Sequence, residues 1–187
     1  EVSPDGLTYT FNLQQGVKWH DGKPFSADDV KFTVMSMLAA DYTGPFQKRW
    51  HALVGGADVS SGKATDLEGL KVVNPTTVQF KLTAPDATFV GLVMRDLKPI
   101  PKHILDGQKI TRENPYSLAP IGTGPYMLAN WNAGSEIELV KNPNYWLEGK
   151  PHFERFVYKI VEEGTTRVTG LKNGELRNGL LKNGELR

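Results

Sequence analysis

Glycine and proline constrain this chain more than any other feature. The 187 residues include 19 glycines and 12 prolines, about 17% together against an average near 12%. Glycine permits sharp turns that other residues avoid, and proline interrupts helices and the interiors of sheets. We therefore expect many turns and short elements rather than long helices. The length predicts little more than one domain, large enough to bury a hydrophobic core.

Alternating apolar and polar residues predict several half-buried strands. The clearest covers residues 7–13, where every second residue is leucine, tyrosine or phenylalanine. A hairpin is expected from 70–73 through a turn at 74–76 to 78–82. Further strands are expected at 17–19, 126–131, 136–140 and 156–161. The last of these is apolar at nearly every position, which is typical of a strand covered on both faces.

Residues 27–40 carry the strongest helix signal. Ser26 is suited to cap the amide of Asp29, and the acidic residues Asp28 and Asp29 suit the positive end of the helix dipole. Phe25 and Val30 occupy the two positions of a hydrophobic staple. Apolar residues at positions 30, 34, 37 and 38 then fall on one helical face. We expect this face to pack on a sheet.

The remaining segments predict short helices and loops. Residues 41–50 are expected to be irregular or a short helix, and 55–69 an exposed loop rich in glycine and polar residues. A helix containing Phe89, Leu92 and Val93 is expected after Pro85–Asp86, a short turn at 102–105, and a last helix from Thr165 or Thr166 to about Leu176. Together these elements predict an α+β fold, with a mixed, largely antiparallel sheet and packed helices.

Composition excludes several classes of function. The net charge of +1 argues against a nucleic-acid partner that binds through a polybasic surface. The longest apolar stretch, near 87–94, is too short for membrane insertion. The absence of cysteine removes disulfides, cysteine-bound zinc, iron–sulfur clusters and thiol catalysis together.

Motifs for catalysis or cofactors are absent from the sequence. The four histidines (His20, His51, His103 and His152) show no metal-ligand spacing. His20–Asp21 is expected to be part of a turn, and Gly122–Pro125 a tight turn before a strand rather than a phosphate loop, because Pro125 removes an amide. We expect no enzyme activity, no cofactor and no metal. The aromatic residues outside predicted strands could stack on a ligand or cover a hydrophobic edge; they are Trp50, Tyr116, Trp131 and Trp146.

The carboxyl-terminal residues contain a repeat. The heptad Leu171–Arg177 recurs unchanged at Leu181–Arg187. A period of ten residues is too short for a solenoid, so a duplicated, artificial or frayed tail is the simpler interpretation, with a genuine docked turn as the alternative. We divide the chain into residues 1–163, one subdomain, residues 164–177, a terminal helix, and residues 178–187, the duplicated tail.

A series of sequence phrases resembles one protein family in a fixed order. Asp5–Leu13 and Gly16–Val30 resemble the signature of family 5 extracellular solute-binding proteins, the dipeptide, oligopeptide and nickel-type receptors of ABC importers. Further phrases agree at 78–82, 101–103, 122–126, 142–146 and 165–176. The resemblance covers about residues 2–176. The chain departs from the family pattern at Arg177, because an acidic residue usually follows the family's Gly–Glu–Leu phrase.

The resemblance implies a fold and a role. It implies that residues 1–163 are a subdomain of lobe one in a two-lobed periplasmic binding protein of type II, peptide-binding class, and that the whole of lobe two is missing. The full receptor would capture a peptide or similar small solute and deliver it to the ABC permease subunits, in the periplasm or another extracytoplasmic place, or as a cell-surface lipoprotein in a Gram-positive source. The isolated segment should bind weakly or not at all. The alternative is a ligand-sensing module of a regulatory protein.

The resemblance also points to three candidate ligand-binding residues. Arg95 follows the predicted helix at 89–94, where an arginine lines the cleft of nickel-type members. Arg49 and Trp50 lie in another loop of similar placement. We expect these three side chains near the solute.

Overall fold

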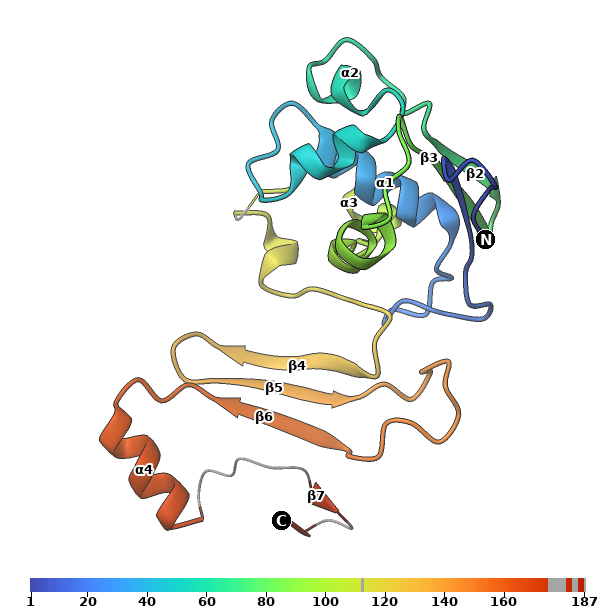
Figure 1. Ribbon diagram of the computed structural model, residues 1–187. Coiled ribbons are helices and arrows are strands. Elements are labelled where there is room, and N and C mark those ends of the chain that lie inside the picture. Colours follow the sequence, from blue (N-terminus) through green and yellow to red (C-terminus); the bar gives the residue numbers. More distant parts are fainter. Residues whose placement is uncertain (112, 175–180, 183–184, 187) are drawn as a thin grey trace.

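The chain forms two parts joined by a narrow connection (Figure 1). The structure is a computed structural model that describes residues 1–111, 113–174, 181–182 and 185–186. The amino-terminal part, residues 1–118, holds a three-stranded sheet and most of the helices. The sheet part, residues 119–174, holds a second three-stranded sheet and one helix. All strand pairs are antiparallel, so the predicted α+β class is confirmed.

The first sheet contains the predicted strand and hairpin. Its strands are β1 (Thr8–Asn12), β2 (Leu70–Asn74) and β3 (Thr77–Lys81), in the order β1-β3-β2. The register places Tyr9 opposite Phe80 and Phe11 opposite Val78. The predicted strand at 17–19 is wrong in extent, because only a single bridge between Lys18 and Pro24 forms there.

Helix α1 (Ala27–Leu38) covers this sheet. Ser26 is its N-cap and forms a capping box with Asp29, as the sequence predicts. The predicted apolar face is confirmed: Val30, Val34 and Leu38 are buried, while Met37 packs against the core from its edge. Burying such a face supplies most of the stability of a short helix in water.

The hydrophobic core lies between α1 and the first sheet. Its aromatic members pack at ring distances of 5.0 to 6.4 Å, in tilted geometry that aromatic pairs prefer. The largest fully buried members of this cluster are Trp50, Phe80, Phe89, Leu38, Leu53, Leu67, Leu70 and Leu82.

Residues 55–69 are not the exposed loop that the sequence predicts. A 3-10 helix, η1 (Gln47–Ala52), leads into helix α2 (Gly56–Ser60), and Val59 and Leu67 are buried in the core. The segment folds onto the core because these two apolar side chains anchor it. Gly56 permits the close approach, since a Cβ there would lie 2.3 Å from the Trp50 carbonyl oxygen.

The segment after the hairpin forms short helical turns. A π-helix, η2 (Phe89–Met94), occupies the position of the predicted helix. Helix α3 (Lys102–Leu105) confirms the predicted turn, and a 3-10 helix, η3 (Pro115–Ser117), ends the amino-terminal part. Pro99 lies between η2 and α3, where proline disfavours a continuous helix, whereas Pro101 is the N-cap of α3 and Pro115 is the first residue of η3, positions that proline tolerates.

The buried carboxylate of Asp29 attaches α3 to α1. It accepts hydrogen bonds from the indole nitrogen of Trp19 at 3.3 Å, the amide of Ser26 at 2.9 Å and the amide of Lys102 at 3.0 Å. Three donors satisfy a charged group that would be costly to bury alone. The residue thus joins the loop before α1, the helix itself and α3.

The sheet part contains strands β4 (Tyr126–Asn132), β5 (Glu136–Lys141) and β6 (Arg155–Lys159), in that order. All three were predicted. The expectation that both faces of the last strand are covered is wrong for the described chain. Tyr158 is 57% exposed, and Val157 and Ile160 are also exposed. The apolar run therefore identifies a surface that the described residues leave open.

The last helix begins earlier than predicted. Helix α4 (Gly164–Lys172) has Glu163 as its N-cap rather than Thr165 or Thr166. It ends at Lys172, before Gly174, which adopts a positive φ of 74° that suits the end of a helix. The predicted end at Leu176 lies outside the described residues. In the tail, β7 (Leu181–Lys182) pairs with β8 (Glu185–Leu186). The division into three segments stays a prediction.

Candidate functional site

Two predicted site residues meet at one carboxylate. Arg49 on η1 forms an ion pair with Asp96 Oδ2, and the Nε of Arg95, the residue after η2, lies 3.5 Å from Asp96 Oδ1. The guanidinium of Arg49 also lies 4.1 Å from the ring centroid of Phe46, within the range of a cation–π contact. We call Phe46, Arg49, Arg95 and Asp96 the arginine cluster.

The arginine cluster has a spare positive charge. Two guanidinium groups share one carboxylate, and a guanidinium carries five N–H donors. The Arg95 side chain is 66% exposed and that of Arg49 is 37% exposed, whereas Asp96 is only 18% exposed. The less exposed Asp96 carboxylate therefore orients the two guanidinium groups and leaves some of their N–H donors facing solvent. Such an arrangement can bind an anionic group such as a carboxylate.

The structure places Trp50 apart from these two side chains. Its side chain is 1% exposed and lies in the core, 6.4 Å from the Phe80 ring. In the described structure it has almost no surface for a solute to contact. It anchors the segment that carries Arg49, and its direct contact with a solute stays a prediction.

Sequence reasoning missed two members of the arginine cluster. Asp96 could have been found, because an acidic residue directly after a candidate arginine can form an ion pair with it. Phe46 gave no comparable signal. It has a left-handed backbone, with φ of 73°, which is uncommon for an aromatic residue and places its ring under the guanidinium of Arg49.

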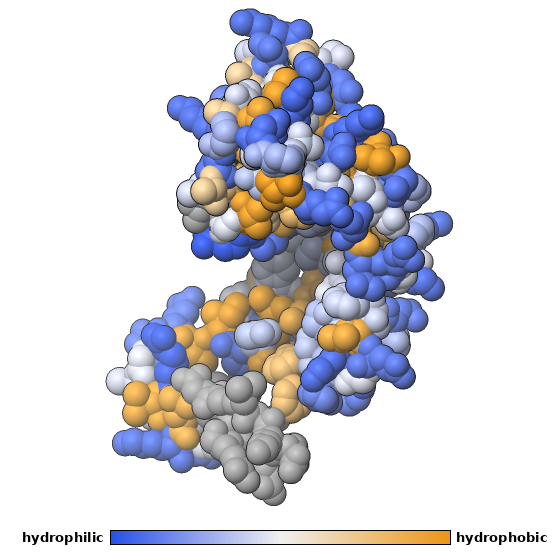
Figure 2. Space-filling view, turned by 45° about the vertical axis from the view of Figure 1, so that its right-hand side comes forward, coloured by the Kyte–Doolittle hydropathy of each residue, from blue (hydrophilic) through white to orange (hydrophobic). Residues whose placement is uncertain are grey.

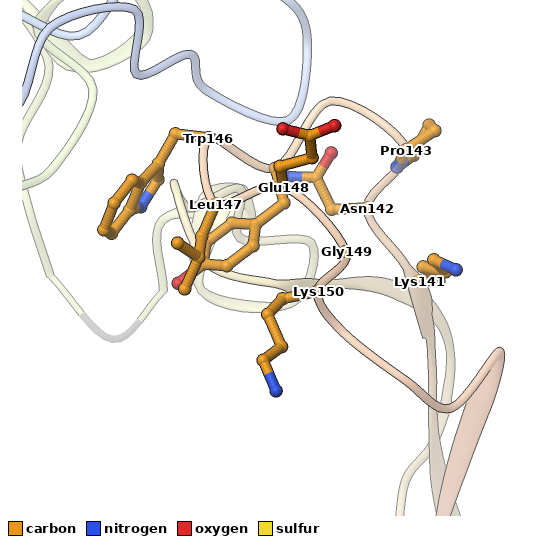
Figure 3. A pocket seen from close by; sticks show the side chains of 9 residues that line it. Lys141, Asn142, Pro143, Trp146, Leu147, Glu148, Gly149 and Lys150 are labelled. Atoms are coloured by element: carbon orange, nitrogen blue, oxygen red, sulfur yellow. The ribbon is translucent and has the colours of Figure 1, made fainter.

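A concave region lies in the loop after β5 (Figure 3). This open cavity of about 410 Å³ is lined only by residues 141–150 of the sheet part. The Tyr145 and Trp146 rings lie 5.6 Å apart, and Trp146 and Leu147 are both exposed. Lys141 points away from the loop and pairs with Glu154 at 3.0 Å. The loop offers exposed aromatic surface without a convergent set of polar groups.

The remaining aromatic candidates differ in exposure. Trp131 is exposed at the end of β4. Tyr116 is half-buried and its hydroxyl donates to the Ile121 carbonyl at 2.6 Å. Burial raises the pKa of this hydroxyl, although the hydrogen bond to Ile121 opposes the shift. Tyr116 therefore helps to hold the segment that leads into β4 in place.

Catalytic and metal-binding geometry is sparse in the described part of the chain. Within it, no group of three or more metal-ligating side chains gathers. Ser60 Oγ lies 2.8 Å from His51 Nε2, but the hydroxyl also donates to the Ala57 carbonyl at 3.1 Å. Neither residue lines the cavity at 141–150. The pair holds α2 against η1.

His20 and the turn at Gly122–Pro125 are far apart in sequence but lie side by side in the structure. The amide of His20 donates to the Gly122 carbonyl at 2.9 Å, and the amide of Gly122 donates to His20 Nδ1 at 3.1 Å. His20 Nε2 lies 3.1 Å from the Gly124 carbonyl oxygen. The predicted structural role of both segments is confirmed, and the contact between them is new.

The comparisons with known proteins agree on one family. The family model described as bacterial extracellular solute-binding proteins, family 5 Middle, matches residues 1–181. The dipeptide-binding protein of Escherichia coli is 34% identical over 186 residues. The oligopeptide-binding protein AppA of Bacillus subtilis is 33% identical over 174 residues.

A solved structure shows the same fold. The ABC transporter substrate-binding protein CtaP of Listeria monocytogenes superposes with a TM-score of 0.79 at 32% identity, over 94% of this chain and 33% of that one. The two curated relatives are likewise covered over only 34% and 29% of their lengths, against 94% and 91% of this chain. The chain therefore spans about a third of the proteins that it matches. Within the described residues, no helix is long and apolar enough to cross a membrane.

Proposed function

The chain belongs to the bacterial extracellular solute-binding proteins of family 5, and we propose that it is part of the substrate-binding component of an ABC importer. The family match over residues 1–181 carries this proposal. Relatives named for dipeptide and oligopeptide binding support peptides as the solute class. The receptor would work outside the cytoplasm and deliver its peptide to the permease subunits. The family is one of solute-binding proteins rather than enzymes.

We propose that Arg95 and Arg49 provide an anion-binding subsite for the solute. A peptide always carries a terminal carboxylate unless it is modified, and a guanidinium binds carboxylates through paired hydrogen bonds. Asp96 holds both guanidinium groups and leaves Arg95 mostly exposed. Trp50, which is buried in the core, would act by holding η1 in place.

The segment alone should be a weak binder. The arginine cluster is open to solvent, and binding sites for small molecules normally enclose most of the ligand surface. The sheet part exposes apolar side chains on β6 and α4, among them Tyr158, Val168 and Leu171. Figure 2 shows hydrophobic side chains on this part beside the recess that separates it from the amino-terminal part. The rest of a receptor would cover such a surface and complete the site.

A chimera tests this function. Residues 1–174 would replace the matched segment of the E. coli dipeptide-binding protein, of which this chain covers 34%. Isothermal titration with dipeptides should show binding by the folded chimera. Arg95→Gln should weaken it by about tenfold or more, as expected for losing a hydrogen bond to a charged group. Lys71→Gln, which removes an equal charge from the exposed edge of β2, should have little effect.

Two outcomes would contradict the proposal. A folded chimera that binds no dipeptide would argue against a receptor function for this segment. Equal affinities of the Arg95→Gln and Lys71→Gln chimeras would remove the arginine cluster from the site while leaving the receptor function in place.

A further inference from the structure

The two parts of the chain meet at a single polar junction. Tyr116 bonds to Ala119 and Ile121, which follow it closely along the connecting chain. Apart from these two bonds, every hydrogen bond between the amino-terminal part and the sheet part, across residues 1–111 and 113–173, involves His20. No ion pair among these residues crosses the junction. Figure 1 shows the loop that carries His20 reaching the chain that leads into β4. This one side chain therefore has an unusual share in how the parts are connected.

Each side of the junction is firmly attached to its own part. On one side, Trp19 next to His20 is buried and donates to Asp29 of α1, and Asp21 pairs with His103 of α3 at 2.7 Å. On the other side, Asn142 after β5 is buried and its side-chain amide donates to the Gly124 carbonyl at 2.9 Å. Its backbone amide donates to the Pro125 carbonyl at 2.8 Å. The turn at 122–125 thus moves with the second sheet.

The hydrogen bonds define the protonation state of His20. The Gly122 amide is a donor, so Nδ1 must be an unprotonated acceptor. The Gly124 carbonyl is an acceptor, so Nε2 must carry the proton and donate. His20 is therefore neutral, in the Nε2–H tautomer. A second proton on Nδ1 would turn two N–H groups toward one another and remove the bond from Gly122.

We propose that His20 is a proton-sensitive latch between the two parts of the chain. The neutral imidazole holds the turn at 122–125 against the loop at 19–24, and protonation of Nδ1 loosens this hold. The backbone bond from His20 to the Gly122 carbonyl survives protonation, so the junction weakens without separating. The orientation of the second sheet relative to the amino-terminal part becomes freer as the solution becomes more acidic.

The surroundings of His20 favour the neutral form. Burial lowers its pKa below the usual 6.5, although the hydrogen bond to Gly124 and the charge of Asp21 act in the opposite direction. The Asp21 carboxylate is engaged by His103 of α3. The segment 119–125 carries no ionisable side chain. The nearest ionisable groups along that chain are the hydroxyls of Tyr116 and Tyr126, and Lys141 next to Asn142 pairs with Glu154.

Imidazole nitrogen NMR on the 187-residue chain tests the protonation state directly. At pH 8, the His20 shifts should report a protonated Nε2 and an unprotonated Nδ1, and the ring should titrate below 6.5. An Nδ1–H tautomer at pH 8, or a ring with both nitrogens protonated at that pH, would overturn the proposal. This measurement needs no variant, so it does not depend on a substituted protein folding.

Hydrogen exchange at the Gly122 amide tests the latch itself. After correction for the intrinsic rate, protection should fall by about 5- to 10-fold as His20 becomes protonated, as expected for the loss of one hydrogen bond. In the same pH range, backbone ¹⁵N relaxation should show the two sheets changing from one rotational correlation time to two. A constant protection factor and a single correlation time would contradict the latch.

His20→Asn supplies the matched variant. The Asn side-chain oxygen can accept from Gly122 in place of Nδ1 but does not titrate, so protection at Gly122 should become independent of pH. His152→Asn, at an exposed histidine of the sheet part, should behave as the wild type does. Persistent pH dependence in His20→Asn would assign the effect to another group. His103 is an unsuitable candidate, because its protonation would strengthen the bond to Asp21.

Discussion

Asp29 shows at the residue scale how one buried side chain organises the amino-terminal part. Its carboxylate accepts three hydrogen bonds, from Trp19, Ser26 and Lys102. The sequence identified Asp29 as a residue of the first helical turn, where acidic side chains are common. It could not reveal the bond from Lys102, because nothing local relates residues 73 positions apart.

Asp29→Asn should destabilise the chain by about 1–3 kcal/mol, because an amide group would turn N–H donors toward N–H donors at a buried site. Urea unfolding measured by circular dichroism would give the free energy of unfolding. Asp28→Asn is the matched control, since Asp28 is exposed on the same helical turn. Equal stabilities of the two variants would show that the three hydrogen bonds contribute little.

Gly69 makes a second prediction at this scale. A Cβ at this position would lie 2.6 Å from the Val54 amide nitrogen and 2.8 Å from the Lys81 carbonyl oxygen. Gly69→Ala should therefore lower the melting temperature, with a cost of about 1–3 kcal/mol for displacing packed backbone. Gly91→Ala meets no atom within 4 Å and should unfold near the wild-type temperature. If Gly69→Ala is as stable as Gly91→Ala, the close approach of these segments is incorrect.

At the scale of elements, local patterns predicted strands better than loops. Period-two alternation gave the strands at 8–12, 77–81 and 136–141, because a strand with one buried face alternates apolar and polar residues. The loop expected at 55–69 was wrong, because Val59 and Leu67 are isolated apolar residues in a polar context and form no period. Likewise, the apolar run of β6 predicted cover on both faces, but periodicity cannot show whether the covering layer belongs to the same segment.

Strand β6 offers a test of which apolar residues support the fold. The ring centroid of Phe156 lies 4.7 Å from that of Tyr126 and 5.4 Å from that of Phe153, whereas Tyr158 is largely exposed. Phe156→Ala should destabilise the sheet part by about 2 kcal/mol or more, and Tyr158→Thr by less than about 1 kcal/mol. Hydrogen exchange of the β5 amides would measure both. A larger loss of protection in Tyr158→Thr would mean that Tyr158 is covered in solution.

At the scale of the whole molecule, the structure distributes β1 to β6 over two separate three-stranded sheets, an arrangement that the sequence did not predict. The pairing of strands distant in sequence depends on contacts that local patterns do not encode. For the candidate site, the resemblance led to Arg49 and Arg95, and the structure brings both to Asp96. The structure also places Trp50 in the core. The sequence did not predict this, because Trp50 was expected to lie in a loop.

We propose that this chain is a receptor segment that holds part of a binding site and needs the rest of the receptor to bind its solute. A thermal-shift titration of the 187-residue chain against separate pools of peptides, nickel chelates and sugars tests this most directly. Saturation at 100 times the dissociation constant would add about 2.7 kcal/mol, or roughly 5–10 °C for a chain of this size. We predict cooperative unfolding with no shift from any pool. A shift of several degrees with one pool would show that the segment encloses a complete pocket, and would contradict the account.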